Sequence, residues 1–406
     1  MAVGSGDLGT LHPVKGVRIG IGSAGIKKPG RKDTVVFELA EGSRVAGTFT
    51  TNAFCAAPVT LAKRHLAQGQ PRYLLVNTGN ANAGTGDIGM QDAESSCAAL
   101  ASLTGVAPQA VLPFSTGVIG EKLPVEKLTA AMPQALADLD ANHWEAAASG
   151  IMTTDTRPKA CSRQIVLDGR TITITGISKG AGMIKPNMAT MLGYVATDAA
   201  IAPALLQTLV SDATEASFNR ITVDGDTSTN DACVLVATGQ AGLEDIDSAE
   251  HPHFPALAEA IREVFIHLAQ AIVRDGEGAT KFVSVVVDGA GTTEEALKVG
   301  YAVAESPLVK TALFASDPNW GRILAAIGRA GVSGLDVSQI DVHLGDVLIA
   351  ERGGRAASYT EAAGAAVMKQ EEIAITINLR RGDVRETIWT TDFSYDYVKI
   401  NAEYRS

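Results

Sequence analysis

A threonine at position 190 stands in a segment that favours neither helix nor strand. The run is Lys185-Pro186-Asn187-Met188-Ala189-Thr190-Met191-Leu192-Gly193. Pro186 lacks a backbone N–H and disfavours helical geometry at the residue before it, and Gly180, Gly182 and Gly193 add flexible backbone on either side. We therefore predict a bent loop around Thr190.

A threonine hydroxyl needs a base before it can attack a carbonyl carbon. A threonine at a new N-terminus supplies that base itself, because an α-amine has a pKa of about 7.7 to 8.0. If the chain cut its own Ala189–Thr190 bond, it would create this amine. The residues thus indicate an N-terminal threonine nucleophile made by self-cleavage.

Two short motifs of other enzyme classes lack the context that they need. Residues 84–89 match the G-x-G-x-x-G dinucleotide fingerprint, but the next expected strand, residues 110–113, carries no carboxylate to hold a ribose. Residues 176–180 match G-x-S-x-G, but glycines and Pro186 prevent the helix that must follow a nucleophile elbow. We expect a structural glycine-rich loop and a bystander Ser178.

Metal and disulfide chemistry are not favoured either. The stretch Asp224–Asp231 resembles a calcium loop, but its twelfth position is Leu235 instead of a glutamate, and polar turn residues beside an active site are the simpler account. His251 and His253 have no further ligand nearby in the sequence. The four cysteines contain no C-x-x-C pair and are expected to be reduced packing residues: Cys55, Cys97, Cys161 and Cys233.

Composition indicates a folded, cytoplasmic protein. The 406 residues suffice for two domains or one large layered domain, and 46% of them are hydrophobic. A net charge of -11 without a basic cluster argues against nucleic-acid binding. The N-terminus does not have the pattern of a signal peptide, and no apolar run reaches the roughly 18 residues that a membrane span requires.

Short β-branched runs alternate with amphipathic segments, which predicts an α/β fold of layered sheets and helices. From about residue 290 a helix followed by strands suggests a C-terminal α+β subdomain, spanning about 290–406. The expected strands are 34–39, 73–76, 110–113, 171–175, 233–236, 282–287, 340–348, 372–379 and 385–390, and the expected helices are 90–103, 203–216, 255–274 and 296–305.

Several stretches together resemble the glutamate N-acetyltransferase (ornithine acetyltransferase) family of arginine biosynthesis. The resemblance extends from about Val14 to Ser406, and no departure occurs at the family's catalytic positions. The stretches are 50–52, 77–84, Pro113-Phe114-Ser115-Thr116-Gly117-Val118, Met152-Thr153-Thr154-Asp155-Thr156, 187–193, 222–228, Asp275-Gly276-Glu277-Gly278-Ala279-Thr280-Lys281 and 400–406.

The resemblance implies a layered fold shared with self-processing β-aminopeptidases. It also implies cleavage between Ala189 and Thr190 into fragments 1–189 and 190–406. Both halves carry family motifs, so the cut should divide one fold and leave the fragments associated. A heterotetramer with two copies of each fragment is expected.

The resemblance further assigns the site residues. Thr190 is the nucleophile, and Thr116 and Gly117 form the oxyanion hole. The positions expected to contact substrate are Thr153, Lys179, Thr190, Glu277, Asn401 and Ser406. N2-acetylornithine carries a carboxylate and a δ-ammonium, so its pocket needs a cation, an anion and neutral polar groups. The sequence leaves open which side chain meets which group.

The activity implied is transfer of an acetyl group from N2-acetylornithine to glutamate through an acetyl-threonine ester. No metal or organic cofactor is expected, because the two amides are nearly isoenergetic. Some family members also accept acetyl-CoA as donor, and the sequence offers no marker for this second activity. The alternative is a self-processing amidase or aminopeptidase of the same fold, in which water attacks the acyl-enzyme.

Overall fold

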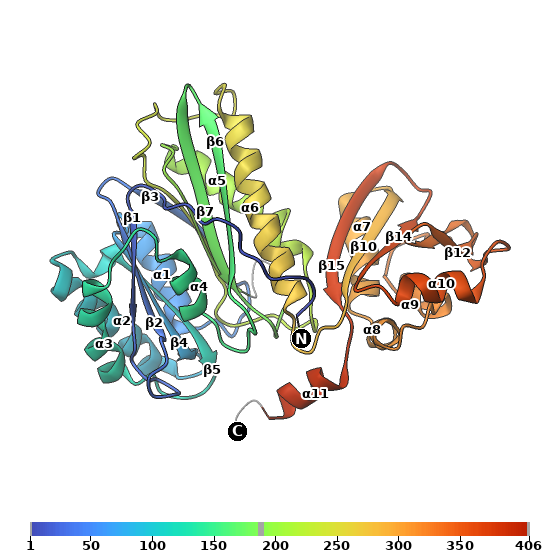
Figure 1. Cartoon of the computed structure of the whole chain (residues 1–406), viewed down its shortest axis with the longest axis horizontal. Helices are drawn as coiled ribbons and strands as arrows, with labels where there is room; N and C mark the ends of the chain where they lie inside the picture. The colour runs from blue at the N-terminus through green and yellow to red at the C-terminus, as the bar shows by residue number, and fades with distance from the viewer. Residues whose placement is uncertain (1, 186–190, 404–406) are drawn as a thin grey trace. The chain divides into compact units, whose positions relative to one another are not determined.

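The structure is a computed structural model of the chain, and it describes residues 2–185 and 191–403 (Figure 1). The chain divides into two compact units. The larger unit comprises Asp7–Asn219 and Asp226–Ile272. The smaller unit comprises Val273–Ser406 together with the short segments Met1–Gly6 and Arg220–Gly225.

The larger unit contains two β-sheets. The first has the strand order β1 (Val17–Gly22), β2 (Thr34–Leu39), β4 (Tyr73–Asn80), β5 (Val111–Val118). The second has the order β3 (Arg44–Phe49), β9 (Ala232–Ala237), β8 (Leu192–Thr197), β7 (Arg170–Lys179), β6 (Lys159–Leu167). The pairs β4–β5 and β8–β9 are parallel, and the other neighbours are antiparallel.

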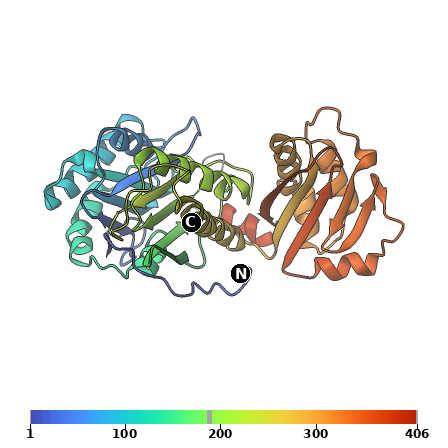
Figure 2. The same ribbon diagram turned by 90° about the horizontal axis from the view of Figure 1, so that it is seen from above.

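Helices cover the outer faces of these sheets. Helices α1 (Ala57–Gln68), α2 (Gly86–Thr104) and α3 (Val125–Ala137) pack on the four-stranded sheet, and Figure 2 shows them in blue to blue-green. Helices α5 (Pro203–Glu215) and α6 (Phe254–Arg274) pack on the five-stranded sheet, and the short α4 (Trp144–Gly150) contacts strands of both sheets. Apolar burial on both faces of each sheet drives this layering.

An aromatic cluster joins the inner faces of the two sheets. The ring of Tyr194 on β8 lies 5.1 Å from that of Phe37 on β2 and 5.3 Å from that of Phe114 on β5, measured between centroids. All three side chains are buried. The contact fixes β8 against the sheet that contains β5, and these two strands lead to the expected catalytic positions.

The smaller unit has one mixed sheet with five helices. Its strand order is β13 (Gly354–Arg355), β12 (Val347–Glu351), β11 (Asp341–Leu344), β14 (Glu372–Asn378), β10 (Phe282–Ala290), β15 (Val384–Thr391). The helices are α7 (Thr293–Ala304), α8 (Pro307–Phe314), α9 (Trp320–Gly328), α10 (Glu361–Met368) and α11 (Tyr395–Ala402). Across both units single 3-10 turns occur at Pro108–Ala110, Phe218–Arg220 and Val337–Gln339, of which Val337–Gln339 lies wholly in the smaller unit.

The expected α/β class is confirmed, and several local expectations are wrong, including the glycine-rich loop expected over 84–89, because α2 already begins at Gly86. The strand expected over 340–348 is a hairpin of β11 and β12, because Gly345 takes a φ of 52° and turns the chain. The loop was expected to extend over residues 185–193, but strand β8 already begins at Leu192. Strand β5 continues to Val118, so Thr116 and Gly117 lie inside it and not beyond it. Within the described residues no helix is long and apolar enough to cross a membrane.

Candidate active site

Thr116 and Gly117 lie near the end of β5, beside the end of the parallel strand β4. Thr116 pairs with Thr78 and Gly117 with Gly79, and the register becomes irregular at Asn80. Thr116 is buried, with 8% of its surface exposed. The end of a parallel strand pair thus presents a hydroxyl and a glycine backbone at one place.

Position 117 admits only glycine at low cost. Its φ is 136°, and a Cβ atom there would lie 2.3 Å from the carbonyl carbon of Gly79 and 2.5 Å from the Asn80 nitrogen. Gly79 itself has a φ of 98°. The two glycines allow the strand ends to approach closely while the backbone turns away from regular strand geometry.

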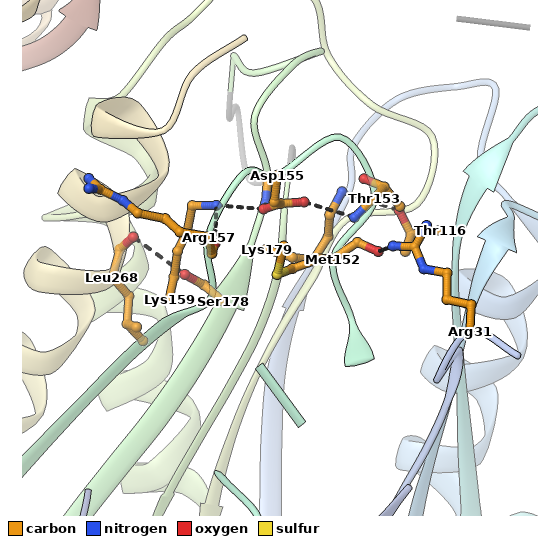
Figure 3. A network of polar contacts seen from close by, with 11 residues as sticks. Arg31, Thr116, Met152, Thr153, Asp155, Arg157, Lys159, Ser178, Lys179 and Leu268 are labelled. Carbon is orange, nitrogen blue, oxygen red and sulfur yellow. Dashed lines mark hydrogen bonds and ion pairs between the residues drawn. The ribbon is translucent and has the colours of Figure 1, made fainter. Parts of the chain in front are cut away.

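Lys179 ends β7 and reaches across to β5. Its Nζ donates a hydrogen bond to Thr116 Oγ1 at 3.3 Å, and the side chain is half-buried (Figure 3). The sequence analysis assigned both residues to the site. The structure brings them together although they lie 63 positions apart in the chain. A cation beside the hydroxyl can stabilise negative charge that develops there.

A buried carboxylate organises the neighbouring loop. Asp155 Oδ1 accepts hydrogen bonds from Lys159 Nζ at 2.6 Å and from the Gly180 N–H at 2.8 Å, while Oδ2 accepts one from the Thr153 N–H at 2.9 Å (Figure 3). The side chains of Asp155 and Lys159 are 0% and 1% exposed, so this ion pair is dry. The backbone at Thr153 and the backbone directly after Lys179 therefore bind the same anion.

The charge state of Asp155 follows from its partners. Burial alone would raise its pKa, but the ammonium groups of Lys159 and Lys179 and the hydrogen bonds from Lys159 and from the backbone of Thr153 together outweigh it. The pKa of Asp155 consequently lies well below its usual range. The site thus contains a permanent buried anion next to two cations.

The turn before β9 binds the backbone of β5. Asn230 Nδ2 donates to the Ser115 carbonyl at 2.9 Å and to the Ala81 carbonyl at 2.5 Å. Ser115 Oγ in turn donates to Asn77 Oδ1 at 2.6 Å. These contacts fix the residue that precedes Thr116, which agrees with the expected role of this turn as a polar support beside the site.

Asp231 follows in the same turn and is also buried, with 4% of its surface exposed. Its carboxyl accepts hydrogen bonds from Ser228 and from the backbone of Met191, and Oδ2 has no partner among the described residues. Burial raises the pKa of Asp231 well above the ordinary value despite these contacts and the Lys179 charge.

The smaller unit holds a second pair of expected site residues. Asn401 Nδ2 on α11 donates to Glu277 Oε2 at 2.8 Å. Glu277 is buried in the loop after α6, in which Gly278 has a φ of 68°. The Gly278 carbonyl oxygen accepts a hydrogen bond from Ser394 Oγ at 2.6 Å. The structure thus brings together a carboxylate and an amide that are 124 positions apart.

The remaining expectations divide into three groups. Ala189, Thr190 and Ser406 lie outside the described residues. Ser178, which was expected to be a bystander, lies within β7; its Oγ donates to the Leu268 carbonyl at 3.4 Å, and the described residues 180–185 form no helix. The expected packing cysteines Cys97, Cys161 and Cys233 are buried, whereas Cys55 is half-buried.

Sequence reasoning gave no role to Asp155 or Lys159, and it treated Asn230 only as one residue of a polar turn beside the site. Asp155 lies within a motif that carried the family resemblance, and its spacing of four from Lys159 was a visible signal for an ion pair. Among the described residues, no cluster of three or more histidine, cysteine, aspartate or glutamate side chains could hold a metal ion.

The fold is that of a layered α/β protein in which a hydroxyl, a glycine backbone and buried charges lie at strand ends, and acyl transfer uses groups of these kinds. Residues 18–406 match the ArgJ family, and the chain belongs to that family.

Relatives support this membership over the full length. The chain is 67% identical to an arginine biosynthesis bifunctional protein ArgJ from Pseudomonas fluorescens and 66% identical to one from Pseudomonas syringae pv. tomato, with 100% of each chain covered. Among solved structures, an arginine biosynthesis bifunctional protein ArgJ from Bacillus halodurans is 40% identical with a TM-score of 0.51, covering 53% of this chain and 100% of that chain.

Proposed function

We propose that this protein transfers the acetyl group of N2-acetylornithine to glutamate, giving N-acetylglutamate and ornithine. The observation that carries the proposal is full-length membership of the ArgJ family, whose relatives are named as bifunctional arginine biosynthesis proteins. The contact between Lys179 and Thr116 supports it, because it pairs a cation with a residue of the expected oxyanion hole.

The first chemical step of this proposal is self-cleavage. The Thr190 hydroxyl attacks the Ala189 carbonyl carbon, the bond to the Thr190 nitrogen breaks, and the nitrogen takes up a proton. Water then hydrolyses the resulting ester. Fragments 1–189 and 190–406 result, and the second begins with the free amine of Thr190.

Acetyl transfer uses the new amine as base. The amine takes the proton of the Thr190 hydroxyl while the hydroxyl oxygen attacks the acetyl carbonyl of N2-acetylornithine. Thr116 and the Gly117 backbone stabilise the oxyanion, and ornithine leaves with the proton on its amine. The amine of glutamate then attacks the acetyl ester by the same steps in reverse.

The charges of the expected substrate-binding residues suggest which group of the substrate each one contacts. Lys179 is suited to a carboxylate, and Glu277 to an ammonium group, because each offers the complementary charge. Thr153, Asn401 and Ser406 are proposed as neutral polar contacts. Each assignment can be tested by a single substitution that leaves the others in place.

We also propose acetyl-CoA as a second acetyl donor for glutamate, because the relatives are named as bifunctional. We propose no metal or organic cofactor, since the transfer exchanges one amide for another of similar free energy. We further propose that two copies of each fragment form a heterotetramer.

One assay tests the function. Purified protein is incubated with N2-acetylornithine, with and without glutamate, and products are separated by chromatography. Acetylglutamate that requires glutamate supports the transferase. Free acetate in both samples, without acetylglutamate, would instead indicate an amidase. Replacing acetylornithine by acetyl-CoA tests the second activity.

A further inference from the structure

Asp155 is bonded to three donors from separate parts of the larger unit. They are the backbone N–H of Thr153, the backbone N–H of Gly180 and the Lys159 ammonium. Thr153 belongs to the loop after α4, Gly180 follows β7, and Lys159 begins β6. A carboxylate with no exposed surface therefore connects a loop with two strands.

We propose that Asp155 is a positioning residue for acetyl transfer, and this rests on the function proposed above. By holding the Gly180 N–H it fixes the end of β7, from which Lys179 reaches Thr116. By holding the Thr153 N–H it fixes a residue assigned to substrate. One side chain thus helps to position two site residues, Thr153 and Lys179, without belonging to the expected set.

The chemistry of the carboxylate explains why this position needs an aspartate. Three donors approach two oxygens, and an amide side chain has one acceptor oxygen and would turn its own N–H groups toward a donor. The anion also faces two cations, Lys159 within hydrogen-bond distance and Lys179 further along the network. Asparagine would remove both the second acceptor and the charge.

A purely structural ion pair would behave differently from a positioning residue. Removing one partner of a buried pair is strongly destabilising, whereas replacing both partners by neutral side chains is often tolerated. Stability should therefore depend on whether the pair of Asp155 and Lys159 is complete or wholly absent. The hydrogen bonds to the Thr153 and Gly180 amides, in contrast, are made by Asp155 and not by Lys159.

Three variants separate these roles. They are Asp155→Asn, Lys159→Met and the double variant Asp155→Asn/Lys159→Met. Each is measured for thermal unfolding and for kcat and KM with N2-acetylornithine and glutamate. Arg163→Met is the matched control, because Arg163 lies on the same strand and pairs with Glu263 at an exposed site.

We expect both single variants to unfold at lower temperature and the double variant to recover much of that loss. Activity should not recover with it: kcat/KM of the double variant should stay on the order of 10- to 100-fold below wild type, as for other residues that orient site groups. Lys159→Met should keep more activity than the double variant, because its Asp155 still binds Thr153 and Gly180. The control should match wild type.

Amide hydrogen exchange gives a second readout that needs no substrate. The amides of Thr153 and Gly180 should exchange faster in the double variant than in wild type, while those of central β7 residues stay protected. A double variant with wild-type kcat, KM and exchange would show that the pair is only structural. If wild type itself formed no acetylglutamate, the proposed function would fail, while exchange would still report whether Asp155 fixes both segments.

Discussion

Gly117 combines an unusual backbone angle with a close neighbour. Its φ of 136° is unfavourable for any side chain, and a Cβ would meet the backbone of Gly79. We expect Gly117→Ala to cost about 1–3 kcal/mol of stability through strain and to reduce turnover on the order of 10²- to 10³-fold, the range for loss of one oxyanion donor. Thermal unfolding and initial rates of acetylglutamate formation check this.

Gly120→Ala is the matched control for that substitution. Gly120 also has a positive φ, 81°, but nothing lies within 4 Å of a Cβ placed there. It therefore carries backbone strain without a collision at the site. Equal loss of turnover in both variants would argue against a specific role for Gly117.

Lys310 on α8 is a buried amine whose titration should be visible in stability. Its Nζ donates to Thr390 Oγ1 at 3.0 Å, and burial lowers its pKa from 10.5 to about 7 despite nearby acidic side chains. Between these two values the unfolded chain holds the proton that the folded chain has lost. The free energy of unfolding should therefore rise from pH 7 toward pH 10, by an amount on the order of a few kcal/mol.

The comparison is with Lys310→Met, which removes the titrating group. Denaturant unfolding of both proteins at several pH values gives the difference in their pH dependence. Lys298→Met is the control, since Lys298 is half-exposed and pairs with Glu294 at the surface. Parallel curves for wild type and Lys310→Met would show that the amine keeps its ordinary pKa.

At the scale of elements, the turn before β9 supports β5 through the Asn230 amide. Asn230→Asp would remove both N–H donors and place a carboxylate against two carbonyl oxygens. We expect a stability loss of about 1–3 kcal/mol or more and turnover reduced at least about tenfold, since Ser115 precedes Thr116. Asn142→Asp, at an exposed loop, is the control. Wild-type rates in the stable Asn230→Asp protein would contradict the support role.

The sequence predicted elements well where apolar periodicity was long. Helix α6 was expected over 255–274 and spans Phe254–Arg274, because its buried face repeats over many turns. The ends of β4 and β5 were missed because Asn77, Ser115 and Thr116 are polar and resemble loop residues. Their backbones nevertheless continue the parallel ladder, and their side chains bond to one another or to neighbouring turns.

The site was predictable only in part, because its side-chain contacts join segments that are far apart in the sequence. Family motifs indicated Lys179 and Thr116, but no local pattern shows that these side chains meet. The anchoring role of Asp155 depends on the Gly180 amide, which lies 25 positions away. Such contacts are set by strand order, and propensity along the chain carries no information about it.

At the scale of the molecule, the expected cut would pass through one sheet. In the five-stranded sheet, β8 and β9 follow Thr190 in sequence, and β3, β7 and β6 precede it. Purified protein should therefore run as two fragments under denaturing conditions and as one particle in native solution. Thr190→Ala should stay intact and inactive. If that variant were also found cut, an external protease would be responsible.

The interleaved strand order of this sheet affects how the melting temperature depends on protein concentration. Because β8 and β9 lie between β7 and β3, neither fragment could leave without breaking two ladders of hydrogen bonds. Unfolding of a cut chain releases two molecules, while unfolding of an intact chain releases one. The melting temperature of the processed protein should consequently rise more steeply with protein concentration than that of Thr190→Ala. Exchange of fragments between differently labelled copies should be as slow as unfolding itself.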